Sequence, residues 1–100
     1  MKAGTNLEKV LESGRFAVTA EAGPPKGTSA KAVQKKGEVL RSCCDAVNVT
    51  DNQTAIARMC SLAGCTLLKQ LGVDPVMQMV TRDRNRIAIQ SDVLGAVALG

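Results

Sequence analysis

Apolar residues along this chain switch repeatedly between the two-residue period of a β-strand and the wider period of an α-helix. Each strand-like run is followed by a helix-like run, so the strands are expected to be parallel and joined by right-handed crossovers. A capping box from Thr5 to Glu8 adds a short helix before the first strand, and Gly14 ends it. The expected elements are helices over 6–13, 29–42, 55–68 and 86–99 and strands over 15–21, 45–50 and 76–81.

Polar residues mark the tips of the three expected strands. Glu21, Thr50 and Thr81 lie 29 and 31 residues apart, close to the length of about 30 residues that one βα unit needs. Parallel strands end at one edge of a sheet, where α/β proteins bind their ligands. The 100 residues hold three such units, whereas a (βα)8 barrel takes about 250 residues. We therefore expect an α/β fold in which residues 1–100 form a short N-terminal helix and the first three βα units of a (βα)8 TIM barrel, a fragment rather than a small open sheet.

Composition narrows the classes of partner. The chain has one Phe and neither Tyr nor Trp, which leaves little aromatic surface for stacking nucleic-acid bases. Its net charge is only +4, and the lysines near residues 26–36 are typical of a solvated helix face, so no nucleic acid is expected. No apolar run is long enough to span a membrane, and Met1-Lys2 does not begin a signal peptide. A cytoplasmic protein without a membrane partner is the expectation.

The four cysteines do not form a metal-binding pattern. Cys43, Cys44, Cys60 and Cys65 contain no C-x-x-C pair, and the chain has no histidine. Their spacing fits no usual zinc site, and an iron–sulfur site has little support. We expect them to be small buried side chains in a protein of a reducing compartment.

Three segments, one at each strand end, resemble the methylenetetrahydrofolate reductase family, above all its short bacterial forms. They are residues 16–25, which end in Gly-Pro-Pro, residues 47–51, and residues 78–83 followed by Asn85-Arg86. Their order and spacing match the family from about residue 16 to residue 100. The resemblance implies a (βα)8 barrel that binds FAD and reduces 5,10-methylenetetrahydrofolate to 5-methyltetrahydrofolate. It also implies NAD(P)H or an iron–sulfur protein as electron donor, and a homo-oligomer or complex subunit.

The resemblance assigns roles to five residues. Glu21 matches the family's catalytic acid, which two residues separate from Pro-Pro. Thr50 matches a threonine beside the flavin and the nicotinamide, and its alternative role is to cap a helix. Asp51 and Asn52 follow at the flavin side, where many relatives carry an aromatic and a small residue. Gln78 matches a flavin-contacting position that is often His; glutamine can form hydrogen bonds there but cannot titrate.

The proposed role of Glu21 is to protonate a weakly basic folate nitrogen and so open the imidazolidine ring. A carboxyl group with a raised pKa suits such a transfer near neutral pH, and we expect Val18, Ala20 and Ala22 to shield the side chain from water. The alternative is a solvated glutamate at a strand end.

Two further expectations concern the polar turn 82–86 and the limits of the chain. Asp83 is expected to stabilise the turn by pairing with Arg82 or Arg86, although these arginines also suit a flavin phosphate or an acidic folate tail. Because later strands carry the remaining family contacts, the chain alone is not expected to bind FAD tightly or to turn over. The alternatives are a small α/β anion-binding module and a fragment of a pterin-binding methyltransferase barrel.

Overall fold

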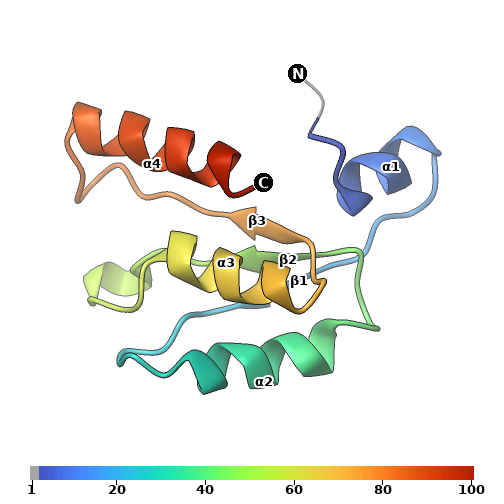
Figure 1. Ribbon diagram of the computed structural model, residues 1–100, viewed down its shortest axis with the longest axis horizontal. Coiled ribbons are helices and arrows are strands. Elements are labelled where there is room, and N and C mark those ends of the chain that lie inside the picture. The colour runs from blue at the N-terminus through green and yellow to red at the C-terminus, as the bar shows by residue number, and fades with distance from the viewer. Residues whose placement is uncertain (1–2) are drawn as a thin grey trace.

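Three short strands pair side by side in chain order to form a parallel sheet. The computed structural model describes residues 3–100, and β2 pairs with β1 on one side and β3 on the other (Figure 1). The expected α/β alternation of strand and helix is confirmed, whereas closure into a barrel remains a prediction. The elements are α1 (Asn6–Glu12), β1 (Thr19–Ala22), α2 (Ala30–Leu40), β2 (Ala46–Val49), a 3-10 turn η1 (Gln53–Ala55), α3 (Ser61–Gln70), β3 (Pro75–Met77) and α4 (Arg86–Ala98).

The core lies between the sheet and helices α2 and α3. Val47 and Val49 of β2 are 0% and 1% exposed, and Leu68 of α3 is 0% exposed. Two glycines let these layers approach. A Cβ on Gly37 would come within 2.7 Å of the Leu68 side chain, and a Cβ on Gly64 within 2.9 Å of Val49, so larger residues would push α2 from α3 and α3 from the sheet.

Helix α1 covers the edge of the sheet at which the strands begin. The Thr5 hydroxyl accepts from the N–H of Glu8 at 3.3 Å, which confirms the expected cap. The N–H of Leu7 donates to the Asp74 carboxylate at 2.9 Å, and the Asn6 amide donates to the Asp45 carbonyl at 2.9 Å. The helix is thus attached to the residues that precede β2 and β3.

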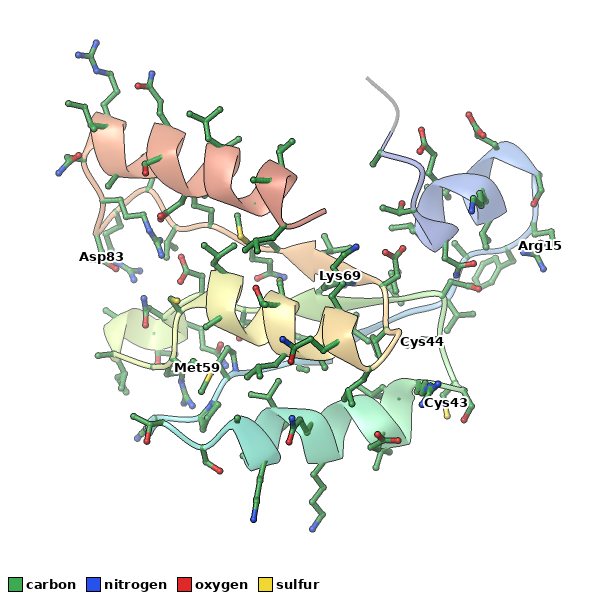
Figure 2. All side chains as sticks on the ribbon, viewed as in Figure 1. Arg15, Cys43, Cys44, Met59, Lys69 and Asp83 are labelled. Carbon is green, nitrogen blue, oxygen red and sulfur yellow. The ribbon has the colours of Figure 1, made fainter. Side chains whose placement is uncertain are left out.

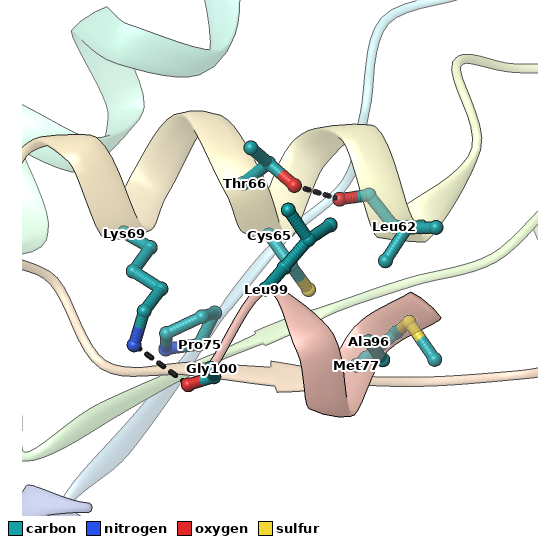
Figure 3. A pocket seen from close by; sticks show the side chains of 9 residues that line it. All are labelled: Leu62, Cys65, Thr66, Lys69, Pro75, Met77, Ala96, Leu99 and Gly100. Atoms are coloured by element: carbon teal, nitrogen blue, oxygen red, sulfur yellow. Dashed lines mark hydrogen bonds between the residues drawn. The ribbon is translucent and has the colours of Figure 1, made fainter. Parts of the chain in front are cut away.

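The C-terminal end of helix α4 lies near α3 and β3. Between α3, β3 and the end of α4 lies a small, mostly apolar cavity of about 120 Å³ (Figure 3). Cys65 and Met77 line it, as does Leu99 after α4, and Lys69 reaches across to the carbonyl oxygen of Gly100 at 2.6 Å. No residue within α4 is buried.

Three of the expected elements have wrong boundaries. The helix expected over 55–68 begins only at Ser61, because residues 56–60 form a non-helical segment whose Met59 N–H donates to the Pro25 carbonyl at 2.9 Å. The strand expected over 76–81 spans Pro75–Met77, since the N–H of Val80 turns to the Asp51 carboxylate. The strand expected over 15–21 begins four residues later and ends one residue later than expected.

Burial tests the expectations about cysteines and lysines. Cys65 is buried and Cys44 half-buried, but Cys43 and Cys60 are exposed, so the expectation of four buried thiols is wrong for two of them. The lysines of α2 are exposed, as a solvated helix face requires. Within residues 3–100, no helix has the length and apolar character needed to cross a membrane.

Candidate functional site

Alternate strand residues face opposite sides of the sheet, and this separates the candidate site from the core. The register aligns Glu21 with Asn48 and Asn48 with Val76. These residues therefore lie in one row on the face opposite the buried Val49, which packs in the core beneath the helices. The N–H of Gln78 donates to the Val49 carbonyl at 3.1 Å and continues the ladder past β3. The structure thus brings Glu21 and Gln78 to one face at the edge where the strands end.

Glu21 lies in the open on this face. The residue is exposed, Val18 is 45% exposed, and Ala22 is 5% exposed on the opposite side of β1. The expectation that Val18, Ala20 and Ala22 shield the carboxyl from water is therefore wrong, because period-two alternation directs the neighbours of Glu21 away from it. Its catalytic role stays a prediction.

The turn 23–25 that follows β1 is fixed through its carbonyl oxygens. They accept in order from the Lys36 ammonium at 2.6 Å, the Arg58 guanidinium at 3.2 Å and the N–H of Met59 at 2.9 Å. The two prolines cannot donate from their backbone nitrogens, so their carbonyl oxygens provide the backbone hydrogen bonds of these two residues. They tie the tip of β1, two residues after Glu21, to α2 and to the segment before α3.

Thr50, directly after β2, has a buried hydroxyl that lacks a partner. The residue is 6% exposed, and its Oγ1 forms no hydrogen bond within the part of the chain that the structure describes. Gly23 lies beside it, and a Cβ there would sit 3.4 Å from both Thr50 Oγ1 and the Gln53 amide nitrogen. A buried polar group without a partner is unfavourable in a free protein. An unpartnered buried hydroxyl of this kind suits a polar atom of a bound ligand, and in this respect Thr50 fits the polar edge of a flavin.

Asp51 is buried in an ion pair. Its carboxylate accepts from the Arg84 guanidinium and from the N–H of Val80 at 2.9 Å, and Arg84 also pairs with Asp92 at 3.1 Å. Burial alone would raise the pKa of the Asp51 carboxyl, but the hydrogen bonds from Arg84 and from the N–H groups of Val80 and Ser61 outweigh it and lower the pKa. This carboxylate joins the end of β2 to the segment before α4. A cofactor that contacted the Asp51 carboxylate would compete with Arg84 and the N–H of Val80 for it. The predicted cofactor role of Asp51 stays a prediction.

Asn52 begins a strained loop. Its backbone is left-handed (φ 43°), and Thr54 (φ 62°) and Ala55 (φ 57°) follow in the same region, which non-glycine residues adopt at a cost of about 1–3 kcal/mol each. The Asn52 side chain accepts from the N–H of Arg58 at 2.8 Å, and its carbonyl accepts from Arg82 at 3.3 Å. Asn52 thus shapes the loop above Thr50, while its predicted contact with a cofactor remains a prediction.

Gln78 is held through its backbone. Its carbonyl accepts from the Ser61 hydroxyl at 2.7 Å, which fixes the first residue of α3 to the tip of β3. The Gln78 side chain is exposed. It is free of the core and remains a candidate to contact a ligand.

The structure also shows residues near the site that could not be identified from the sequence. Lys36, Arg58 and Ser61 hold the strand tips but lie 13, 34 and 17 residues from the carbonyls they bind, and no local pattern signals such pairs. The buried Arg58 Nε has no partner among the described residues. The expected pairing of Asp83 with Arg82 is confirmed at 2.7 Å, with both side chains about half exposed.

Comparison with known proteins gives one result. The family model for methylenetetrahydrofolate reductase matches residues 6–100, as a partial domain consistent with an N-terminal fragment. No curated protein and no solved structure matches the chain significantly. The match covers nearly the whole chain, and it includes the residues that gather at the strand tips. The chain therefore belongs to the methylenetetrahydrofolate reductase family.

Proposed function

We propose that this chain is the N-terminal part of a flavin-dependent (βα)8-barrel enzyme that reduces 5,10-methylenetetrahydrofolate to 5-methyltetrahydrofolate. Family membership supports an oxidoreductase of folate metabolism. The finer assignment is supported by the strand ends, where the predicted acid Glu21 and the predicted flavin contact Gln78 lie on one face.

The observation that carries the proposal is the buried, unpartnered hydroxyl of Thr50 beside Gly23. Such a group needs a partner that the described part of the chain does not provide. In the proposed complex the Thr50 hydroxyl binds a polar edge of FAD. FAD, when bound, supplies the hydride. Gln78 forms a hydrogen bond to the same cofactor, and Asn52 and Asp51 shape its border.

In the proposed reaction Glu21 donates a proton to a folate nitrogen. Its carboxyl is exposed on the open face of the sheet, where a bound substrate could reach it. The Lys36, Arg58 and Met59 contacts that fix the turn 23–25 hold the tip of β1 in place, and such preorganisation favours proton transfer.

The remainder of the pocket is proposed to come from further βα units beside β3. Apolar side chains of α4, among them Ile87 (69% exposed) and Leu94 (71% exposed), form a surface that such units would cover. The electron donor is proposed to be NAD(P)H or an iron–sulfur protein, and the enzyme to be a cytoplasmic homo-oligomer or complex subunit. Residues 1–100 alone are predicted neither to bind FAD tightly nor to turn over.

The test is Glu21→Gln in a barrel protein that carries this chain. Flavin reduction by the electron donor should survive, because it needs no proton from Glu21. Oxidation of the reduced flavin by methylenetetrahydrofolate should slow by about 10²-fold or more, the usual scale of acid catalysis. Rapid-mixing absorbance at the flavin band measures each half-reaction separately.

Glu38→Gln is the matched control, because Glu38 is exposed on α2 and far from the strand tips in sequence. It should leave both half-reactions unchanged. An equal loss of both half-reactions in Glu21→Gln would assign Glu21 a structural role and reject the proposal for it.

A further inference from the structure

Two adjacent thiols lie in the turn between α2 and β2, at the opposite edge of the sheet from the strand tips (Figure 2). Cys43 is exposed and Cys44 is half-buried. The Cys43 thiol donates to the carbonyl of Val39 at 3.4 Å, and the Cys44 thiol donates to the carbonyl of Leu40 at 3.4 Å. Both sulfurs are therefore held at the last turn of one helix, and neither takes part in the site proposed above.

This pair is poorly suited to oxidation. Burial and the neighbouring Cys43 raise the pKa of the Cys44 thiol, and a protonated thiol reacts slowly with peroxides. Adjacent Cα atoms are about 3.8 Å apart, below the roughly 4.4–6.8 Å that disulfides span. A direct disulfide would strain the turn, whereas a bridging atom between the sulfurs would relieve that mismatch.

The number of available ligands restricts what that atom can be. Within residues 3–100, no group of three or more Cys, Asp and Glu side chains is placed to hold a metal ion. The nearest carboxylate in sequence, Asp45, accepts from the N–H of Val18 at 2.9 Å. A structural zinc ion needs four protein ligands. The site instead suits a thiophilic atom that binds two sulfurs from the protein and already carries a third substituent of its own.

We propose that Cys43 and Cys44 form a chelating dithiol site for monosubstituted trivalent arsenicals. The arsenical R–As=O reacts with both thiols to give R–As(S)₂ and one water molecule. Two As–S bonds form, the As=O bond breaks, and the two thiol protons leave on the oxygen. Arsenic stays trivalent, so the reaction needs neither oxidant nor reductant.

The other two thiols provide an internal comparison. Cys65 is 7% exposed in the core, and burial, with a contribution from Cys60, raises the pKa of its thiol to about 11. Cys60 is exposed at the start of α3. Bridging this second pair would require pulling a core side chain towards the surface, so we expect the arsenical to select Cys43 and Cys44.

The test uses the reduced 100-residue chain and phenylarsine oxide. Intact-mass spectrometry should show one adduct per chain, and a thiol assay should fall from the four thiols of the sequence to about half, a loss of two per adduct. Cys43→Ser and Cys44→Ser should each weaken binding by about 10²-fold or more, because the second thiol acts intramolecularly. The control Cys60→Ser should bind as the parent chain does.

Alkylation of the parent chain tests the site without any substitution. The bound arsenical should protect Cys43 and Cys44 from iodoacetamide and leave Cys60 reactive, as peptide mapping can show, and an added dithiol should remove it. Unchanged affinity in Cys43→Ser, or protection of Cys60 in place of Cys43, would overturn the proposal. Circular dichroism of each variant shows whether the fold is intact, and the mapping result stands if Cys44→Ser fails to fold.

Discussion

Helices α3 and α4 are both well formed, yet different forces hold them. α3 buries Ser61, Gly64, Cys65 and Leu68 against the sheet and α2. α4 buries no residue. Arg84, just before α4, pairs with Asp51 and with Asp92 in the middle of α4, and the C-terminal end of α4 lines the small cavity of Figure 3. The comparison teaches that packing sets the position of α3, while a local cap and charges set the position of α4.

The largest effect is expected from a substitution in the packed core beneath α3. Leu68→Ala removes a side chain that is 0% exposed and should lower the free energy of unfolding by about 2–5 kcal/mol, through lost burial and a new cavity. The matched change Leu94→Ala on α4 removes a side chain that is 71% exposed. It should change the free energy of unfolding by no more than about 0.5 kcal/mol. Urea unfolding of the chain, followed by circular dichroism, measures both. Equal losses would mean that α4 is packed as tightly as α3.

The second prediction concerns the ion pair between Asp51 and Arg84, the residue just before α4. Asp51→Asn keeps the shape of the side chain but removes the charge that pairs with Arg84, whose side chain is only 15% exposed. The free energy of unfolding should fall by about 2 kcal/mol at neutral pH, as expected for a lost hydrogen bond to a charged group. Because the folded-state pKa of Asp51 is lowered, its contribution is fully present above the ordinary pKa of about 3.9 and is lost as the pH falls through the lowered value.

The difference in stability between the parent chain and Asp51→Asn should therefore narrow as the pH drops below about 4. Asp83→Asn is the control, because its ion pair with Arg82 is about half exposed on both sides. Such surface pairs contribute little, so this variant should unfold as the parent does. A gap between Asp51→Asn and the parent that stays constant in acid would show that Asp51 acts through packing rather than charge.

The difference between local caps and long-range contacts also explains how far the fold could be predicted from the sequence. The expected ranges of α2, β2 and α4 are confirmed within two residues at each end, because caps and period are local signals, such as Asn85 accepting from the N–H of Ala88 at 2.9 Å. The sequence predicts a helix from residue 55, but the bonds of Arg58 and Met59 to the turn 23–25 hold residues 56–60 out of the helix. Local periodicity carries no information about that competition.

The candidate site divides in the same way. The spacing of the strands predicts that Glu21, Thr50 and Thr81 share one edge, and the parallel register confirms this edge for Glu21 and Thr50. The prediction is wrong for Thr81, because β3 ends at Met77 and Gln78 is the residue that follows it. The burial of Asp51 depends on Arg84, 33 residues away, and could not be predicted from either residue alone. The exposure of Glu21 was mispredicted because its apolar neighbours in sequence lie on the other side of the strand.

The smallest expected change in the free energy of unfolding distinguishes residues that stabilise the fold from residues that bind a ligand. Thr50→Val replaces a buried hydroxyl that has no partner in the described chain, so the free energy of unfolding should stay unchanged or rise by up to about 1 kcal/mol. Ser61→Ala is the control: it removes the 2.7 Å bond to Gln78 and should lower that free energy by about 1 kcal/mol. A loss in Thr50→Val as large as that in Ser61→Ala would mean that the hydroxyl serves the fold. Unchanged stability, together with weaker flavin binding in a protein that carries this chain, would mean that Thr50 is kept for its ligand.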